Sequence, residues 1–341
     1  MSFNPQDSKQ NADPSSTFAP NRRRAKSNRP LRIFSGSANR ALAESVSRAM
    51  DVPLGKCTTT RLPDSEIHVQ VDEPVRGDDV FLIQPCPAPV NDHLVELLLY
   101  IDAFRRASAH SITAVMPYFP YARQERMAQG REAISAKVVA TSLESLGASR
   151  VLYVDIHAPA IQGFFDIPAD PLSALQVLCE PFLQRPELLA NAIVVAPDSG
   201  RVKLANKYAE TLGIPLALMH KRRVGFDHVE TTHVVGEIAG KVPILIDDII
   251  AGGSVLDQIP ALIDAGALPS VHLAITHGIL TASARERLDR PEIEELCITD
   301  SVPMSKDRDH AKIRVCSIAP MLARAIRRIH EGSSLDGISQ S

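Results

Sequence analysis

Two adjacent carboxylates, Asp247 and Asp248, follow the apolar run of residues 242–246. The loop that comes next contains the triplet Gly-Gly-Ser at residues 252–254. Glycines let a backbone approach an anion closely enough for loop N–H groups to bind its oxygens, and carboxylates accept hydrogen bonds from sugar hydroxyls. The spacing therefore favours a site for a phosphorylated sugar, although an ordinary strand-to-helix turn in an α/β sheet uses the same residue types.

Polar residues follow several other predicted strands in the same way. Residues 197–200 read Pro-Asp-Ser-Gly, residues 220–223 read His-Lys-Arg-Arg, His157 follows the run 151–155, and residues 117–126 carry aromatic and charged side chains. Because ligands of open α/β sheets bind beyond the carboxyl ends of the strands, we expect these segments to converge. Two anion-binding turns, basic side chains, carboxylates and a histidine fit two phosphorylated substrates with a divalent metal between them.

The elements that must position these residues alternate between strands and helices along the chain. Apolar runs predict strands at residues 31–34, 80–84, 112–116, 151–155, 192–196, 215–219, 242–246, 272–276, 296–299 and 313–315. Amphipathic periodicity predicts helices at residues 41–50, 93–107, 134–146, 202–212, 255–265, 282–288 and 319–329, with Ser254 as the cap of the fifth. This alternation predicts an α/β fold with parallel sheets flanked by helices.

The pattern divides the chain into three parts. Residues 1–30 are rich in Ser, Asn, Pro, Gln and Arg and contain little to bury, so a disordered N-terminal tail is expected there. Residues 31–165 and 166–336 each repeat the strand–helix alternation, which predicts two α/β domains in tandem.

Composition excludes several classes of protein. The chain has 341 residues, of which 45% are hydrophobic and 23% charged, and its formal charge of -3 argues against a nucleic-acid partner. No apolar stretch reaches the length that spans a bilayer, so no membrane partner is expected. The five cysteines form no CxxC pair, and the N-terminus has no hydrophobic signal core, so we expect a soluble protein of the cytoplasm.

Ordered motifs over most of the chain carry a resemblance to a known family. They are Phe34-Ser-Gly-Ser-Ala-Asn39, Arg61-Leu-Pro-Asp-Ser-Glu-Ile67, Tyr118-Phe-Pro-Tyr-Ala-Arg-Gln-Glu-Arg126, Val154-Asp-Ile-His157, Ile161-Gln-Gly-Phe-Phe165, Ala196-Pro-Asp-Ser-Gly200, Lys221-Arg-Arg223, Ile246-Asp-Asp-Ile-Ile250, Ala274-Ile-Thr-His-Gly278 and Met321-Leu-Ala-Arg-Ala-Ile-Arg327. From about residue 31 to 336 the chain resembles the ribose-phosphate diphosphokinase family, also called phosphoribosyl pyrophosphate synthetases.

The resemblance implies two tandem type I phosphoribosyltransferase-like domains and a Mg²⁺-dependent transfer. The 1-hydroxyl of ribose 5-phosphate would take the β,γ-diphosphoryl group of ATP, giving phosphoribosyl diphosphate and AMP. A homo-oligomer, a hexamer in the family, is implied as well, because the family's adenine-binding loop completes the site of a neighbouring subunit.

The resemblance also assigns roles position by position. The residues that match the catalytic cations are Lys221 and Arg223. The residues that match ATP contacts are Asp64, Glu66, Arg123, Gln124 and His157. The residues that match ribose 5-phosphate contacts are Asp247, Asp248, Gly252, Gly253 and Ser254. The residues that match metal ligands are His157 and Asp198.

The chain departs from the family pattern at its loops. The ribose-phosphate loop is one residue short and lacks a third acid and a threonine, Arg201 stands where a second glycine is usual, and Leu62 replaces an aromatic that stacks on adenine. These departures favour an alternative, a catalytically weak regulatory or scaffold subunit of a synthetase complex. Retention of the catalytic cations, the histidine and the acids favours the enzyme. A base-using phosphoribosyltransferase would leave the ATP-side motifs unexplained.

Overall fold

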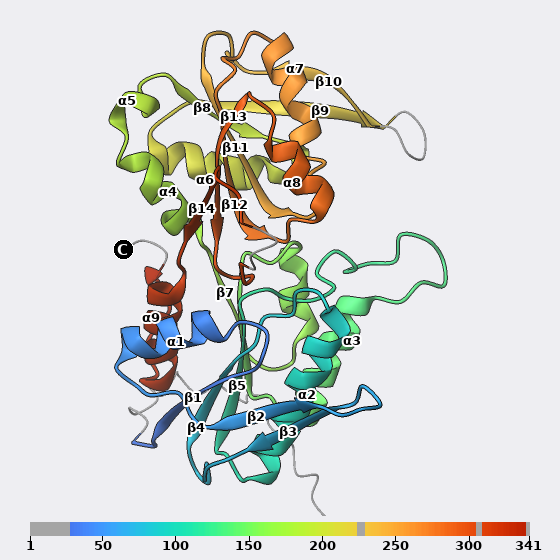
Figure 1. Cartoon of the computed structure of the whole chain (residues 1–341), viewed down its shortest axis with the longest axis vertical. Helices are drawn as coiled ribbons and strands as arrows, with labels where there is room; N and C mark the ends of the chain where they lie inside the picture. Colours follow the sequence, from blue (N-terminus) through green and yellow to red (C-terminus); the bar gives the residue numbers. More distant parts are fainter. Residues whose placement is uncertain (1–27, 224–228, 305–308, 339–341) are drawn as a thin grey trace, which may run out of the picture.

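The computed structural model describes residues 28–223, 229–304 and 309–338, and for residues 221–232 it describes no side chains. The tail expected at residues 1–30 therefore lies outside the described residues, apart from its last three. The described chain forms two α/β units, one above the other in Figure 1. In the described part of the chain, no helix is both long and apolar enough to cross a membrane.

The first unit is built on a five-stranded parallel sheet with the order β1-β4-β5-β6-β7. Its strands are β1 (Leu31–Ser35), β4 (Asp79–Ile83), β5 (Ser111–Met116), β6 (Arg150–Val154) and β7 (Ala169–Leu172). A separate antiparallel hairpin joins β2 (Cys57–Arg61) to β3 (Ile67–Val71). Strand β7 lies beyond the boundary expected at residue 165, so the first sheet extends to Leu172.

Helices cover both faces of this sheet because its strands are apolar on both faces. Ile33 of β1 packs with α1 (Arg40–Met50) and α9 (Ala319–His330) on one face. The next residue, Phe34, packs with α2 (Val90–Arg106) and α3 (Ser135–Leu146) on the other face. The expected end of α3 at Gly147 is confirmed by its left-handed backbone, φ 114°, which a glycine adopts without strain.

The second unit contains a seven-stranded sheet with the order β10-β9-β8-β11-β12-β13-β14, parallel except for β10. Its strands are β8 (Ala192–Ala196), β9 (Leu216–Arg223), β10 (Val229–Val235), β11 (Val242–Ile250), β12 (Val271–Gly278), β13 (Ile293–Thr299) and β14 (Ile313–Cys316). Helices α4 (Leu175–Leu183), α5 (Pro186–Leu189) and α6 (Val202–Leu212) precede or follow β8. Helices α7 (Ile259–Asp264) and α8 (Ala282–Leu288) pack on the opposite face from α4 and α6.

Two expectations about the central segment are wrong. Strand β11 continues to Ile250 instead of ending at residue 246, because its last residues still pair with β12. The helix expected from residue 255 begins at Ile259, after the 3-10 turn η3 (Leu256–Gln258), so Ser254 lies in a turn and caps no helix. Both differences arise because the chain first continues its strand pairing and then forms a turn before the helix begins.

Candidate active site

A cavity of about 380 Å³ lies where the carboxyl ends of the strands of both sheets meet. Its walls are formed by Val90, Asn91, Tyr118, Phe119, Tyr121, Ala122, Arg123, Gln124, Asp155, Ile156, His157, Asp248, Ile249 and His277. The loop after β5 provides the aromatic wall, and β11 and β12 provide the wall from the second unit. The convergence expected from the ends of the strands is therefore present, with both units contributing.

His157 and Asp248 meet across the two units. The loop after β6 carries His157, and the strand β11 carries Asp248, whose side chain is only 5% exposed. Nδ1 of His157 lies 2.7 Å from Oδ2 of Asp248. A carboxylate at this distance fixes the orientation of the imidazole ring and leaves Nε2 as the ring nitrogen free of this contact.

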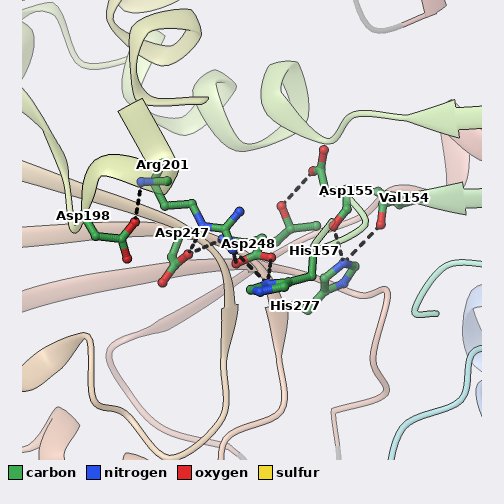
Figure 2. A network of polar contacts seen from close by, with 10 residues as sticks. Val154, Asp155, His157, Asp198, Arg201, Asp247, Asp248 and His277 are labelled. Atoms are coloured by element: carbon green, nitrogen blue, oxygen red, sulfur yellow. Dashed lines mark hydrogen bonds and ion pairs between the residues drawn. The ribbon is translucent and has the colours of Figure 1, made fainter. Parts of the chain in front are cut away.

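Arg201 binds the acidic pair from the opposite side. Its Nε lies 3.0 Å from Oδ1 of Asp247, and its Nη2 lies 2.8 Å from Oδ1 of Asp248 and 2.8 Å from Nδ1 of His157. The Arg201 side chain is 18% exposed, so these contacts are largely shielded from water. Figure 2 shows the guanidinium reaching from its turn to both carboxylates. Sequence analysis singled out Arg201 as a departure but did not predict this contact.

The two carboxyl groups titrate very differently because they are buried side by side. Burial and the neighbouring Asp248 carboxyl raise the pKa of Asp247 to about 8, and the Arg201 charge only partly opposes this. Burial acts in the same direction on Asp248, but hydrogen bonds with His157 and Asp247 and the Arg201 charge lower its pKa to about 2. Arg201 therefore contacts a pair of carboxyl groups that differ in acidity, of which Asp248 ionises more readily.

Asp198 shapes the turn from which Arg201 extends. It follows β8 and accepts a hydrogen bond from the backbone N–H of Gly200 through Oδ1, at 2.9 Å. The 3-10 turn η2 (Ser199–Arg201) then leads directly into α6. The turn expected from the Pro-Asp-Ser-Gly motif is present, and it points its arginine at the neighbouring acid pair.

His277 and Asp155 are cavity-wall residues that join the two units, and the sequence pattern assigned neither of them a role. Nε2 of His277 lies 3.1 Å from the carbonyl oxygen of Val154, and its Nδ1 lies 2.8 Å from Oγ of Ser301. Oδ2 of Asp155 accepts a hydrogen bond of 2.8 Å from Oγ1 of Thr276. Burial lowers the pKa of His277, so a neutral ring fits this position. The rule that ligand sites follow the ends of strands would have found His277, directly after the strand expected at residues 272–276.

The remaining predicted site residues fall into three groups. Arg123 and Gln124 line the cavity with His157 and Asp248. Lys221 and Arg223 lie in the last three residues of β9, and their side chains are outside the described part of the structure. Other predicted residues do not line the cavity itself, namely Asp64, Glu66, Asp198, Asp247, Gly252, Gly253 and Ser254.

The two loops in that last group have distinct surroundings. Asp64 and Glu66 are exposed in the turn between β2 and β3, where Oδ1 of Asp64 accepts a hydrogen bond from the N–H of Glu66 at 3.2 Å. Gly253 packs against α8 with φ +81°, and a Cβ there would lie 3.1 Å from Cα of Ala284. Its left-handed backbone and close approach explain why a glycine stands at this position.

Comparisons with known proteins identify the class of this fold and site. The model for the N-terminal domain of ribose phosphate pyrophosphokinase matches residues 31–147, and the model for the phosphoribosyl synthetase-associated domain matches residues 227–339. The crystal structure of phosphoribosylpyrophosphate synthetase from Mycobacterium smegmatis is 40% identical, with a TM-score of 0.83, over 89% of this chain and 100% of that one. The expected α/β fold with parallel sheets flanked by helices is thereby confirmed.

Curated relatives agree over almost their whole length. The chain is 44% identical to the ribose-phosphate pyrophosphokinase of Bacillus caldolyticus over 306 residues, which cover 89% of this chain and 96% of that protein. It is 45% identical to the ribose-phosphate pyrophosphokinase of Mesorhizobium japonicum over 310 residues, 90% of this chain and 99% of that one. The chain belongs to the ribose-phosphate pyrophosphokinase family, which confirms the resemblance found in its motifs.

Proposed function

We propose that the chain is a ribose-phosphate pyrophosphokinase that moves the β,γ-diphosphoryl group of ATP to the 1-hydroxyl of ribose 5-phosphate. The observation that carries the proposal is the 2.7 Å contact between His157 and Asp248 in a cavity built by both units. It places an oriented imidazole from the ATP-side motif beside a carboxylate from the ribose-side motif. Membership of the family supports the same reaction.

The residues around the cavity divide the two substrates between them. Arg123 and Gln124, on the wall from the first unit, would contact ATP. Asp247 and Asp248, on β11, would accept hydrogen bonds from the ribose hydroxyls. The loop of residues 252–254 would bind the 5-phosphate through its backbone N–H groups and a serine hydroxyl.

The reaction depends on positive charge that stabilises its transition state and requires no covalent intermediate with the protein. The ribose 1-hydroxyl oxygen attacks the β-phosphorus and gives up its proton to solvent, the bond from that phosphorus to the bridging oxygen of the α-phosphate breaks, and AMP leaves with the electron pair. Negative charge accumulates on the transferred oxygens, so fixed cations stabilise the transition state. Lys221 and Arg223 are the side chains we assign to this role.

The polar groups fit a Mg²⁺ ion that arrives with its nucleotide. Among the residues that the structure describes, no three His, Cys, Asp or Glu side chains are grouped so that they could hold a metal by themselves. His157 is oriented through Nδ1 by a carboxylate, which is how proteins fix metal-binding imidazoles. We assign the ion to His157 and Asp198, and bound Mg²⁺ would neutralise phosphate charge.

The assembly we propose is a homo-oligomer in the cytoplasm. The exposed loop of Asp64 and Glu66 lies away from the cavity of its own chain, as a loop that completes a neighbour's adenine site would. Val95, Leu99 and Val138 on α2 and α3 are 45%, 37% and 60% exposed, so this face offers apolar area to a second subunit.

The test is AMP formation by purified protein with ATP and Mg²⁺, with and without ribose 5-phosphate. The enzyme should form AMP only when ribose 5-phosphate is present, in equal amount to phosphoribosyl diphosphate. A folded protein that makes no AMP would instead support the regulatory or scaffold subunit. The ion pairs that Arg201 makes with the ribose-binding carboxylates are the observation that keeps this alternative open.

A further inference from the structure

Arg201 occupies oxygen atoms that the ribose hydroxyls need. Its guanidinium lies 3.0 Å from Oδ1 of Asp247 and 2.8 Å from Oδ1 of Asp248. Asp248 is 3% exposed, so this charge is held in a poorly solvated place. A sugar hydroxyl is neutral and cannot balance the charge that the guanidinium balances there. Ribose 5-phosphate alone is therefore a poor competitor of Arg201 for these two carboxylates.

The contacts of Arg201 with the site are mutually incompatible at one atom. Nδ1 of His157 lies 2.8 Å from Nη2 of Arg201 and 2.7 Å from Oδ2 of Asp248. A guanidinium only donates hydrogen bonds and a carboxylate only accepts them, so one ring nitrogen cannot satisfy both at once. When Arg201 moves away, Nδ1–H donates to Asp248 without competition, which is the orientation that the proposed metal-binding role of His157 requires.

A phosphate group bound at the neighbouring turn would offer Arg201 a second anionic partner. Arg201 is the last residue of η2, next to the Asp198–Gly200 turn that the sequence pattern predicts to bind an anion. A triphosphate chain at this turn would present several charged oxygens to a guanidinium whose fork matches phosphate geometry. A swing of one side chain would then exchange a carboxylate partner for a phosphate partner and keep the arginine paired.

We propose that Arg201 is a positioning residue that occupies the carboxylates of the ribose site and leaves them when the triphosphate binds. The inference rests on the proposed function for the identity of the two substrates. In the absence of nucleotide, Arg201 holds Asp247 and Asp248; with nucleotide bound, it turns to the phosphates and frees the carboxylates for the ribose hydroxyls. Binding of the two substrates is therefore coupled through one side chain.

The experiment measures ribose 5-phosphate affinity by calorimetry at constant Mg²⁺, with and without α,β-methylene-ATP, which cannot release AMP. The wild type should bind ribose 5-phosphate at least about fivefold more tightly when the analogue is present. The variants Arg201→Met and Arg201→Gly should bind ribose 5-phosphate alone more tightly than the wild type does, and the analogue should change their affinity less. Lys203→Ala is the matched control, because Lys203 is an exposed cation in the first turn of α6.

Two results would overturn the proposal. One is a wild type whose ribose 5-phosphate affinity is the same with and without the analogue, which requires no variant to fold. The other is an Arg201→Met protein, folded by circular dichroism, that binds ribose 5-phosphate no more tightly than the wild type, because Arg201 would then be a permanent part of the site. AMP formation by the wild type tests the proposed reaction separately, so the two failures are distinguishable.

Discussion

Nδ1 of His157 and Oδ2 of Asp248 lie 2.7 Å apart, although 91 positions of sequence and two different sheets separate them. The contact joins the two units in the wall of the cavity. It also makes the orientation of the His157 ring depend on a residue of the other unit.

Replacing Asp248 by Asn should therefore affect more than sugar binding. The amide keeps the size of the side chain but loses the charge that orients His157 and attracts the arginine. We expect turnover to fall about 10- to 100-fold, with weaker binding of Mn²⁺ measured by electron paramagnetic resonance in the presence of ATP. Asp257→Asn, at an acid that is 48% exposed in the same unit, should leave both unchanged. Near-normal turnover of Asp248→Asn would contradict the orienting role.

Lys221 is expected to act on the transition state alone. Lys221→Ala should lower the rate of AMP formation by about 10²-fold or more while the circular dichroism spectrum and the thermal midpoint stay as in the wild type. Lys207→Ala removes one charge from the exposed surface of α6 and serves as the control. If Lys221→Ala retained a normal rate, Lys221 would have no part in the mechanism.

The lowered pKa of Glu295 predicts a loss of folding stability at acid pH. The nearby His272 ring, with Nδ1 at 3.6 Å, and the Arg185 and Arg314 charges lower the pKa of Glu295 to about 2 from 4.5, although burial opposes them. An acid whose pKa is lowered by folding stabilises the folded state above its unfolded pKa, and this contribution is lost as pH falls from about 4.5 to 2.

Glu295→Gln should accordingly be less stable at pH 7 by on the order of 1–2 kcal/mol once solvent screening is allowed for. Between pH 4.5 and 2 its free energy of unfolding should change less than that of the wild type. Urea unfolding across this range measures both, with Glu294→Gln at the exposed neighbouring position as the control. Parallel curves for the wild type and Glu295→Gln would remove this carboxylate from the pH response.

The apolar surface on α2 and α3 predicts association between copies of the chain. Light scattering should give a mass that is a multiple of 37.1 kDa at working concentration. Val138→Glu places a charge where the side chain is 60% exposed, and we expect it to lower the mass. Val235→Glu, at a residue that is 61% exposed on β10, should not. A monomeric wild type would contradict the proposal that a neighbouring subunit completes the adenine site.

Continuous apolar runs made the sheet strands readable from the sequence. Every residue of β4 and β8 is buried, and apart from Asp79 at the start of β4 all of these residues are apolar. The hairpin β2–β3 was missed because β2 reads Cys-Thr-Thr-Thr-Arg with three of its five residues exposed. Strand β7 was missed because it contains Asp170 and Pro171, which are poor strand signals. Strands that are stabilised mainly by pairing with neighbouring strands show little apolar periodicity in their own sequence.

The site was predictable as far as it follows from topology. The ends of parallel strands share an edge, so the approach of His157 to Asp248 followed from their positions after two predicted strands. The choice of partner by a long side chain does not follow from topology. Arg201 stands where a second glycine is usual in the family, and its ion pairs with Asp247 and Asp248 depend on the length and direction of one arginine side chain.

The last helix of the chain lies against the first. Helix α9 packs on α1, as the dark red and blue ribbons of Figure 1 show, and Nη2 of Arg327 donates a hydrogen bond of 3.1 Å to the carbonyl oxygen of Met50. During synthesis on the ribosome, Leu42 and Val46 of α1 can therefore be buried against α9 only after residues 277 positions further along the chain have been made. The two units cannot mature strictly one after the other, and a nascent chain stopped before Ala319 would keep that apolar face open to chaperones.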